Sequence, residues 1–457
     1  MTLTATLLAM AALLATLAIL LVGLKAIEKR SRLHPELLRK GVHVGMGLVV
    51  LTLPWVFDRA WPVIVLAILA CGTMVATRAS RRLRSGIGTV VGGVGRDSLG
   101  EIYFPTAVTV LFLLSRGDWL LYVVPILMLA LADAVAALVG VRYGLSQYRT
   151  SDGHKSLEGS LAFFMVAFFS AHLPLLLLTD TGRAEAVLIA TILAFLVMML
   201  ECVAWRGLDN LFIPLGAHAF LRLYLSADTE LLLFHLLVAV LLTVFALVWR
   251  HRRKLDDSAL FGCVLFGFTA FTLGGWLWLL GPVVFFLTLI LVWPRSTEDR
   301  PHTVYAMLAS AAAGLGWLFA YSITGKGWLL VPFTGSFAAQ LTLYGVARFG
   351  HQPDRGPRSL RLLGDIGLGW LLIQCPTLLI AFAGGLADEA SNASGPDVPG
   401  LLSDLGLGLL ATSLVAMIFY LLVPRIYGSP MREPAINPTF ATLGTVASVV
   451  AGLRWLI

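Results

Sequence analysis

Long apolar runs recur along the whole chain, from residue 3 to residue 453. Many of them are about 17 to 25 residues long, the length that a helix needs to cross roughly 30 Å of hydrocarbon. Charged residues make up 13% of the sequence, whereas roughly a quarter of the residues in a soluble domain are charged. The sequence therefore predicts an all-α, polytopic integral membrane protein, a helical bundle of about 14 to 16 transmembrane helices.

The basic residues lie mostly in alternate connections between these runs. The first run, 3–24, has no basic residue before it but is followed by Lys25, Lys29 and Arg30, so we expect its N-terminus outside. Of the 33 Lys and Arg residues, alternation from that start leaves outside Arg59, Arg116, Arg183, Arg222, Lys326 and Arg454. This bias predicts an integral protein of the cell (inner) membrane. The net charge of +7 is explained by cytoplasmic loops that face anionic lipid and requires no nucleic-acid partner.

Charged and polar residues collect at the predicted cytoplasmic ends of the helices in the first half of the chain. Such residues are costly in or near a membrane and usually functional. They are Arg39, Lys40, His43, Glu101, Asp133, Lys155, Glu158, Ser160, Glu201, Asp209 and Asn210. The second half carries few charges within its apolar runs, and we expect Asp365, the main exception, to be a helix N-cap at the membrane surface.

The segment "DAVAALVGVRYG" places Asp133, Gly140 and Gly144 on one helical face. A face of small residues lets another helix, or a ligand, approach the backbone closely. Helix packing alone explains the alanines and glycines, but it does not require the aspartate.

The stretch "DGHKSLEGS" precedes an apolar run and supplies Lys155, Ser156, Glu158 and Gly159. A lysine and the backbone N–H groups of a helix N-terminus form a site for anions, and glycine permits close approach of a polyphosphate. The alternative is a capping box in which Ser156 caps the helix, which leaves the lysine and the glycines unexplained. The sequence has no GxxxxGK[ST] loop, so ordinary P-loop nucleotide binding is not expected.

Asp209 and Asn210 precede another apolar run, with Pro214 near its first turn. Helix capping is one interpretation of each. Acidic side chains at this level are also suitable ligands for Mg²⁺, which takes one or two carboxylates together with substrate phosphates and water.

The series "RKGVH", "GEIYFP", "DAVAALVGVRYG", "HKSLEGS" and "LDNLFIP", in this order, resembles the polyprenol kinase family, which includes dolichol kinase, phytol kinase and the CTP-dependent diacylglycerol kinase. The resemblance implies an enzyme that phosphorylates the hydroxyl of a membrane lipid alcohol, with CTP as donor and a divalent metal such as Mg²⁺. It covers residues 35–225, which we interpret as the catalytic membrane domain. Residues 1–34 then form an N-terminal anchor helix, and 226–457 form an additional multi-spanning domain of unknown role.

The resemblance, together with the chemistry of these side chains, leads to a hypothesis for the catalytic residues Asp133, Lys155, Glu158 and Asp209 and for the residues around them. Asp133 and Asp209 would bind the metal. The nucleotide would be bound by Arg39, Lys40, Gly140, Gly144, Lys155, Ser156 and Gly159. Glu158 would be a base or second metal ligand, and His43, Glu101, Glu201 and Asn210 are further candidates.

Two alternatives stay open at this point. One is CMP transfer of the phosphatidate cytidylyltransferase type, although the characteristic "HGG…DR…D" run of those enzymes is absent from the sequence. The other is a transporter, but transporter sites usually lie near the middle of the bilayer, and here the charges gather at one face. Cytoplasmic placement of these groups suits a soluble nucleotide donor.

Overall fold

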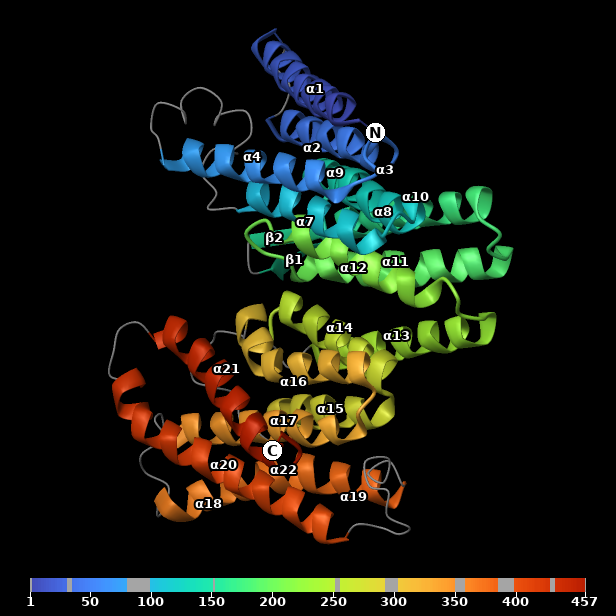
Figure 1. The fold of residues 1–457 in the computed structure, drawn as a ribbon. Coiled ribbons are helices and arrows are strands. Elements are labelled where there is room, and N and C mark those ends of the chain that lie inside the picture. The colour runs from blue at the N-terminus through green and yellow to red at the C-terminus, as the bar shows by residue number, and fades with distance from the viewer. Residues whose placement is uncertain are drawn as a thin grey trace. The chain divides into compact units, whose positions relative to one another are not determined.

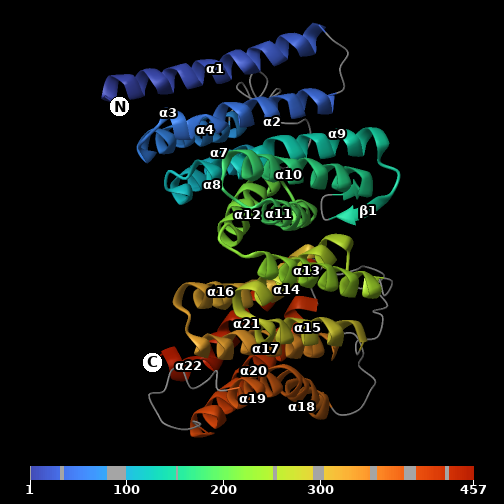
Figure 2. The ribbon, with the colours of Figure 1, turned by 90° about the vertical axis from the view of Figure 1, so that its right-hand side faces the viewer.

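The computed structural model describes residues 2–30, 35–79, 99–150, 153–250, 255–291, 303–349, 358–384, 398–427 and 432–456 (Figures 1 and 2). Within these ranges, 12 helices are long and apolar enough to span a membrane, and three shorter apolar helices accompany them. The predicted all-α, polytopic membrane fold is confirmed. The predicted basic loops at 80–98, 251–254, 292–302, 350–357 and 428–431 lie outside the described residues.

The chain divides into two compact units, Met1–Val240 and Leu241–Ile457. The division falls within α13 (Thr229–Trp249), beyond the boundary that the sequence analysis placed after residue 225. The compactness of the two units assigns no role to either of them, so the predicted functional domains stay predictions.

The first unit contains the segment that resembles the kinases. Its elements are α1 (Leu3–Arg30), α2 (Pro35–Leu51), α3 (Leu53–Val56), α4 (Ala60–Ala79), α7 (Gly100–Ser115), α8 (Trp119–Leu127), the π-helical turn η1 (Met128–Ala132), α9 (Asp133–Tyr143), β1 (Gln147–Thr150), β2 (Gly153–Ser156), α10 (Leu157–Leu178), α11 (Arg183–Val203) and α12 (Asp209–Tyr224). Helix α10 packs against α9 and α11, and α12 packs against α7, α8 and α11. Ile192, Leu193 and Val197 of α11 are fully buried, so this apolar helix forms part of the centre of the unit.

Two short antiparallel strands interrupt the helical pattern between α9 and α10. Tyr148 lies opposite Lys155, and Arg149 lies opposite His154. Because alternate residues of a strand face opposite sides, Tyr148 and Lys155 share one face of this hairpin. The sequence analysis did not predict these strands, since the segment is short and mostly polar and lacks the run of apolar residues that usually identifies a strand.

The second unit is arranged around α17 (Leu330–Phe349). Its other elements are α14 (Asp257–Gly274), α15 (Trp276–Leu291), α16 (Val304–Thr324), η3 (Gly327–Leu329), α18 (Arg358–Gly369), η4 (Trp370–Gln374), α19 (Cys375–Ala383), α20 (Val398–Tyr427), α21 (Arg432–Ala451) and α22 (Leu453–Leu456). Helix α17 contacts α15, α16, α18, α20 and α21, and its Phe333 and Phe337 are buried in the core.

Asp365 does not cap a helix, contrary to expectation, because α18 begins at Arg358 and contains it. Its side chain lies against Gly345 of α17, where an added Cβ would come within 2.5 Å of the Asp365 Cγ. The Asp365 carboxylate is therefore accommodated by a close approach of two helices.

Candidate active site

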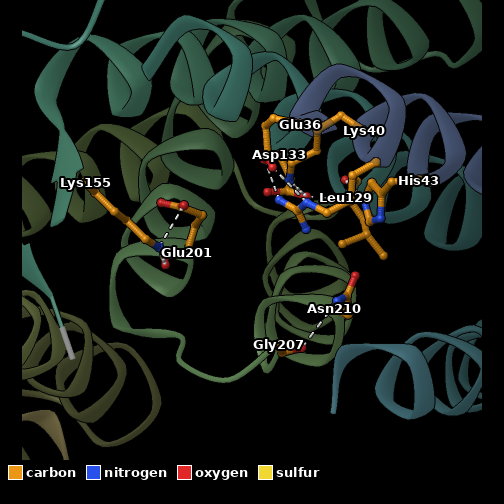
Figure 3. A network of polar contacts seen from close by, with 10 residues as sticks. Glu36, Lys40, His43, Leu129, Asp133, Lys155, Glu201, Gly207 and Asn210 are labelled. Carbon is orange, nitrogen blue, oxygen red and sulfur yellow. Dashed lines mark hydrogen bonds and ion pairs between the residues drawn. The ribbon is translucent and has the colours of Figure 1, made fainter. Parts of the chain in front are cut away.

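A buried ion pair joins α2 to α9. The Lys40 Nζ lies 2.6 Å from the Asp133 Oδ2, and both residues are almost inaccessible to solvent, with exposed fractions of 4% and 7%. The His43 Nε2 lies 3.4 Å from the same carboxylate oxygen and 3.0 Å from the Leu129 carbonyl oxygen. Figure 3 shows Lys40 and His43 converging on Asp133 and Leu129. The predicted Lys40, His43 and Asp133 therefore form one site.

The local backbone explains how these side chains meet. At Gly47, two turns along α2 from Lys40, an added Cβ would lie 2.3 Å from the Ala130 Cβ of η1, so only glycine permits this approach. The π-helical turn ends directly before Asp133, and such turns are frequent at functional sites because they locally alter the direction of side chains.

Asp209 lies within electrostatic range of this pair. It is the first residue of α12, with Leu208 at the N-cap, so it does not cap the helix. Its carboxylate interacts electrostatically with Asp133, Lys155 and Lys40. In the part of the chain that the structure describes, no hydrogen bond or ion pair reaches the Asp209 side chain.

The hairpin brings Lys155 to the same region. The Lys155 Nζ lies 2.8 Å from the Glu201 Oε1 at the end of α11 and also donates to the Glu201 carbonyl oxygen. Burial of the ammonium group opposes its charge, but the Glu201 carboxylate outweighs that effect and the pKa of Lys155 lies above its ordinary value. Lys155 is therefore a permanent cation at neutral pH.

Lys40, Asp133, Lys155, Glu201 and Asp209 are called the charge cluster below. When all five groups are ionised, the three carboxylates exceed the two ammonium groups by one negative charge. Asp209 is the member without a counter-ion in direct contact. The cluster thus offers carboxylate oxygens and ammonium groups side by side, an arrangement suited to a metal–phosphate ligand.

Tyr148 lies on the same face of the hairpin as Lys155 and connects the hairpin to α10 and α11. Its hydroxyl lies 2.6 Å from the Ser160 Oγ and 3.0 Å from the Cys202 Sγ. Burial raises the pKa of the Tyr148 hydroxyl, which keeps it protonated and able to donate a hydrogen bond. Sequence analysis missed Tyr148, because its role depends on a hairpin that the sequence did not predict.

Ser156 and Glu158 hold the start of α10. The Ser156 Oγ accepts a hydrogen bond from the Gly159 N–H at 3.1 Å, which is the helix-capping alternative of the sequence analysis. The Glu158 carboxylate accepts from the Ser146 N–H at 3.1 and 3.3 Å, and Ser146 in turn accepts from the Leu157 N–H. Because the Gly159 and Leu157 N–H groups are bonded within the protein, a bound phosphate would take its hydrogen bonds from other donors in this conformation.

Gly140, Gly144 and Gly159 let α9 and the start of α10 touch. An added Cβ on Gly144 would lie 2.3 Å from the Gly140 carbonyl oxygen and 2.8 Å from Ser156. One on Gly159 would lie 3.0 Å from the Ala136 carbonyl oxygen. The glycines therefore have a packing function here, and their predicted contact with nucleotide stays a prediction.

We expect Gly144→Ala to destabilise the first unit by about 1–3 kcal/mol, the usual range for overpacking, and to lower activity by displacing the hairpin that carries Lys155. The measurement is the thermal unfolding midpoint of the purified protein. Gly72→Ala in α4 is the matched control, because an added Cβ there meets no atom within 4 Å. Equal midpoints for the two variants would contradict the packing role.

The remaining predicted residues lie around the charge cluster. Arg39 forms a two-pronged pair with Glu36, at 2.5 and 3.0 Å, and interacts electrostatically with Asp133 and Asp209. Asn210 donates to the Gly207 carbonyl oxygen at 3.4 Å (Figure 3). Glu101 lies in the first turn of α7, whose start is tied to the α11–α12 connection by a hydrogen bond from the Leu99 N–H to the Arg206 carbonyl oxygen at 3.0 Å.

Comparison with known proteins gives one informative match. No family model matches the sequence, and no solved structure matches it. A curated phytol kinase from a Synechocystis species is 30% identical over 184 residues, which are 40% of this chain and 76% of the relative. With the ordered motifs of the first unit, this similarity shows that the chain belongs to the polyprenol kinase family, whose members phosphorylate lipid alcohols.

Proposed function

We propose that this protein is a lipid alcohol kinase that transfers the γ-phosphoryl group of CTP to the hydroxyl of an isoprenoid alcohol or diacylglycerol in the membrane. The observation that carries the proposal is the charge cluster, in which two lysines and three carboxylates from five separate elements lie close together, with all four other charges acting on Asp209. Phosphoryl transfer is accelerated mainly by positioning and by neutralisation of phosphate charge. A cluster of this composition can supply both.

The nucleotide would be held by cations of the cluster and its margin. Lys155 is charged at neutral pH and only partly buried, so its ammonium group can exchange the Glu201 carboxylate for a phosphate oxygen. Arg39 is nearly half exposed and its planar guanidinium suits a phosphate. The Lys40 ammonium group, which contacts Asp133, would add positive charge to the same site. CTP as the donor is inferred from the family resemblance.

A divalent metal fits the residues that are present. The ion pair with Lys40 and the contact with His43 both use the Asp133 Oδ2, and among the described residues no hydrogen bond or ion pair reaches its Oδ1. The Asp209 carboxylate likewise keeps its oxygens for a ligand. Because Mg²⁺ often takes one or two carboxylates plus substrate phosphates, Asp133 and Asp209 would be sufficient to hold it. The ion would neutralise charge on the transferred phosphoryl group.

In the proposed reaction, the lipid hydroxyl oxygen attacks the γ-phosphorus, the bond from that phosphorus to the bridging oxygen breaks, and CDP leaves. The hydroxyl proton passes to a general base. The chain's own contribution is to hold the phosphates and to exclude water around a buried carboxylate. Glu158 remains a candidate base from the sequence, although its carboxylate is bonded to the Ser146 N–H here. We place the site at the cytoplasmic face of the cell membrane, where the soluble nucleotide is available.

The test is phosphoryl transfer by the purified full-length protein. We expect label from γ-labelled CTP to appear in one of four offered lipids, phytol, farnesol, a long polyprenol or diacylglycerol, with ATP a poorer donor. Removal of divalent metal with a chelator should abolish the transfer, and Mg²⁺ should restore it. Release of pyrophosphate from CTP and phosphatidate, with no labelled lipid, would instead indicate CMP transfer.

A further inference from the structure

The second unit contains a small cavity between the ends of its spanning helices. Its volume is about 50 Å³. It lies where α17 and α20 begin and where α19 and α21 end, next to the short terminal helix α22. Helix ends of alternating direction mark a membrane surface, and the sequence analysis places Lys326 and Arg454, beside this cavity, on the outer side.

The walls of the cavity are mainly apolar. They include Trp328, Val331, Leu378, Phe382 and Leu401. The ring of Trp328 is stacked on that of Trp455, with 6.1 Å between centroids and 8° between planes. Indole rings at a membrane surface typically lie between hydrocarbon and head groups. This cavity is therefore suited to the part of a lipid that lies next to its head group.

One wall carries a fixed ion pair. The Asp404 carboxylate, in a residue only 6% exposed, accepts hydrogen bonds from the Trp455 Nε1 at 3.1 and 3.2 Å. The Arg454 Nη1 lies 3.7 Å from the Asp404 Oδ2, and the Arg454 Cζ lies 4.7 Å from the centroid of the Trp455 ring. Asp404, Arg454 and Trp455 therefore hold each other in place, and the two charges cancel.

The size and the charge balance restrict the ligand. At roughly 10–15 Å³ for each water-sized position, the cavity holds about as much as a hydroxyl group and a few carbons. A compensated ion pair gives little attraction to a phosphate, whereas a hydroxyl can donate to the carboxylate and accept from the guanidinium at once. The exposed Val398 and Leu402 at the start of α20 provide an apolar surface for a chain that leaves the cavity.

We propose that this cavity binds the hydroxyl end of a neutral lipid alcohol, as a second lipid site that is separate from the charge cluster. The proposal rests on the second unit alone and does not depend on the kinase function. The proposed ligand has a polar head with one hydroxyl group and an unbranched or isoprenoid tail that lies in the surrounding bilayer.

The experiment uses the full-length protein in nanodiscs and a farnesol analogue with a diazirine near its hydroxyl end. After illumination, mass spectrometry locates the labelled peptides. We expect label in the segments 327–331, 378–382, 401–404 and 454–455, and competition by unlabelled farnesol but not by farnesyl phosphate. The inactive variant Lys155→Ala should be labelled equally at these segments, so a failure of the kinase proposal leaves this result intact.

Two variants test the cavity itself. Ala381→Phe fills it and should lower labelling of these segments at least tenfold, the equivalent of about 1.4 kcal/mol, while Leu421→Phe, a change at an exposed position near the other end of α20, should leave it unchanged. Asp404→Asn keeps the shape and should lower labelling severalfold. Monodisperse elution of each variant verifies folding. Labelling that Ala381→Phe and Asp404→Asn both leave unchanged, or equal competition by farnesyl phosphate, would overturn the proposal.

Discussion

Asp133→Ala is expected to abolish phosphoryl transfer and to destabilise the first unit by about 3–5 kcal/mol, the usual result of removing one partner from a buried ion pair. The reason is that Lys40, only 4% exposed, would keep its charge with no carboxylate in contact. His43 would also lose one of its two polar contacts. The measurements are the rate of label transfer from CTP and the thermal unfolding midpoint.

A double variant separates the two effects. Replacing Lys40 and Asp133 together, as Lys40→Met with Asp133→Leu, removes both charges and should recover much of the lost stability, because apolar residues can replace a buried ion pair at little cost. Activity should stay absent, since we assign the Asp133 carboxylate a role in binding the metal. Recovery of activity with stability would mean that Asp133 is a structural residue only.

Lys155→Ala is expected to lower kcat/KM for the nucleotide at least about 100-fold, equivalent to about 2.7 kcal/mol of transition-state binding. The variant loses the cation that we assign to the phosphates, and the Glu201 carboxylate loses its ion-pair partner while it still interacts electrostatically with Asp209. The matched control is Glu201→Gln, which frees Lys155 from its carboxylate without removing the lysine. We expect a much smaller loss of kcat/KM for Glu201→Gln. An equal loss in both variants would indicate that the Lys155–Glu201 pair only fixes the position of the hairpin.

The pH dependence of stability follows from the raised pKa of Lys155. A cation whose folded pKa is raised contributes fully below its unfolded value, ordinarily 10.5, and the contribution is lost as pH rises through the folded pKa. Lys155 is therefore protonated in the folded and the unfolded state between about pH 6 and 9, and it adds no inflection to the pH dependence of the free energy of unfolding in that range.

The spanning helices could be predicted because apolar length is a local property of the sequence. Helix α11, for example, has no charged residue between Glu185 and Glu201. The gathering of charged residues at one side also followed from the sequence, since the alternation of basic loops places the ends of successive helices. These inferences need no knowledge of which helices touch.

The individual contacts could not be predicted, because they depend on which distant segments pack together and not on the local sequence. Lys40 and Asp133 are 93 residues apart in the chain, and the pairing of Lys155 with Glu201 depends on a hairpin of mostly polar residues. The π-helical turn before Asp133 is built from Met, Leu and Ala, which favour an ordinary α-helix equally well. Gly140, Gly144 and Gly159 lie where α9 meets the start of α10, and the structure gives them a packing function. Their predicted contact with a nucleotide stays a prediction.

The separation of Lys40 and Asp133 along the chain has a consequence for the biosynthesis of the protein. Helix α2 is made before α9, so during synthesis Lys40 enters the membrane region without its carboxylate. A lone ammonium group is unfavourable in hydrocarbon, and a long lysine side chain near a helix end can extend to the lipid–water boundary. We therefore expect α2 to reach its final depth only after α9 has been inserted beside it, so that the order of translation delays assembly of the candidate site until Asp133 has been made.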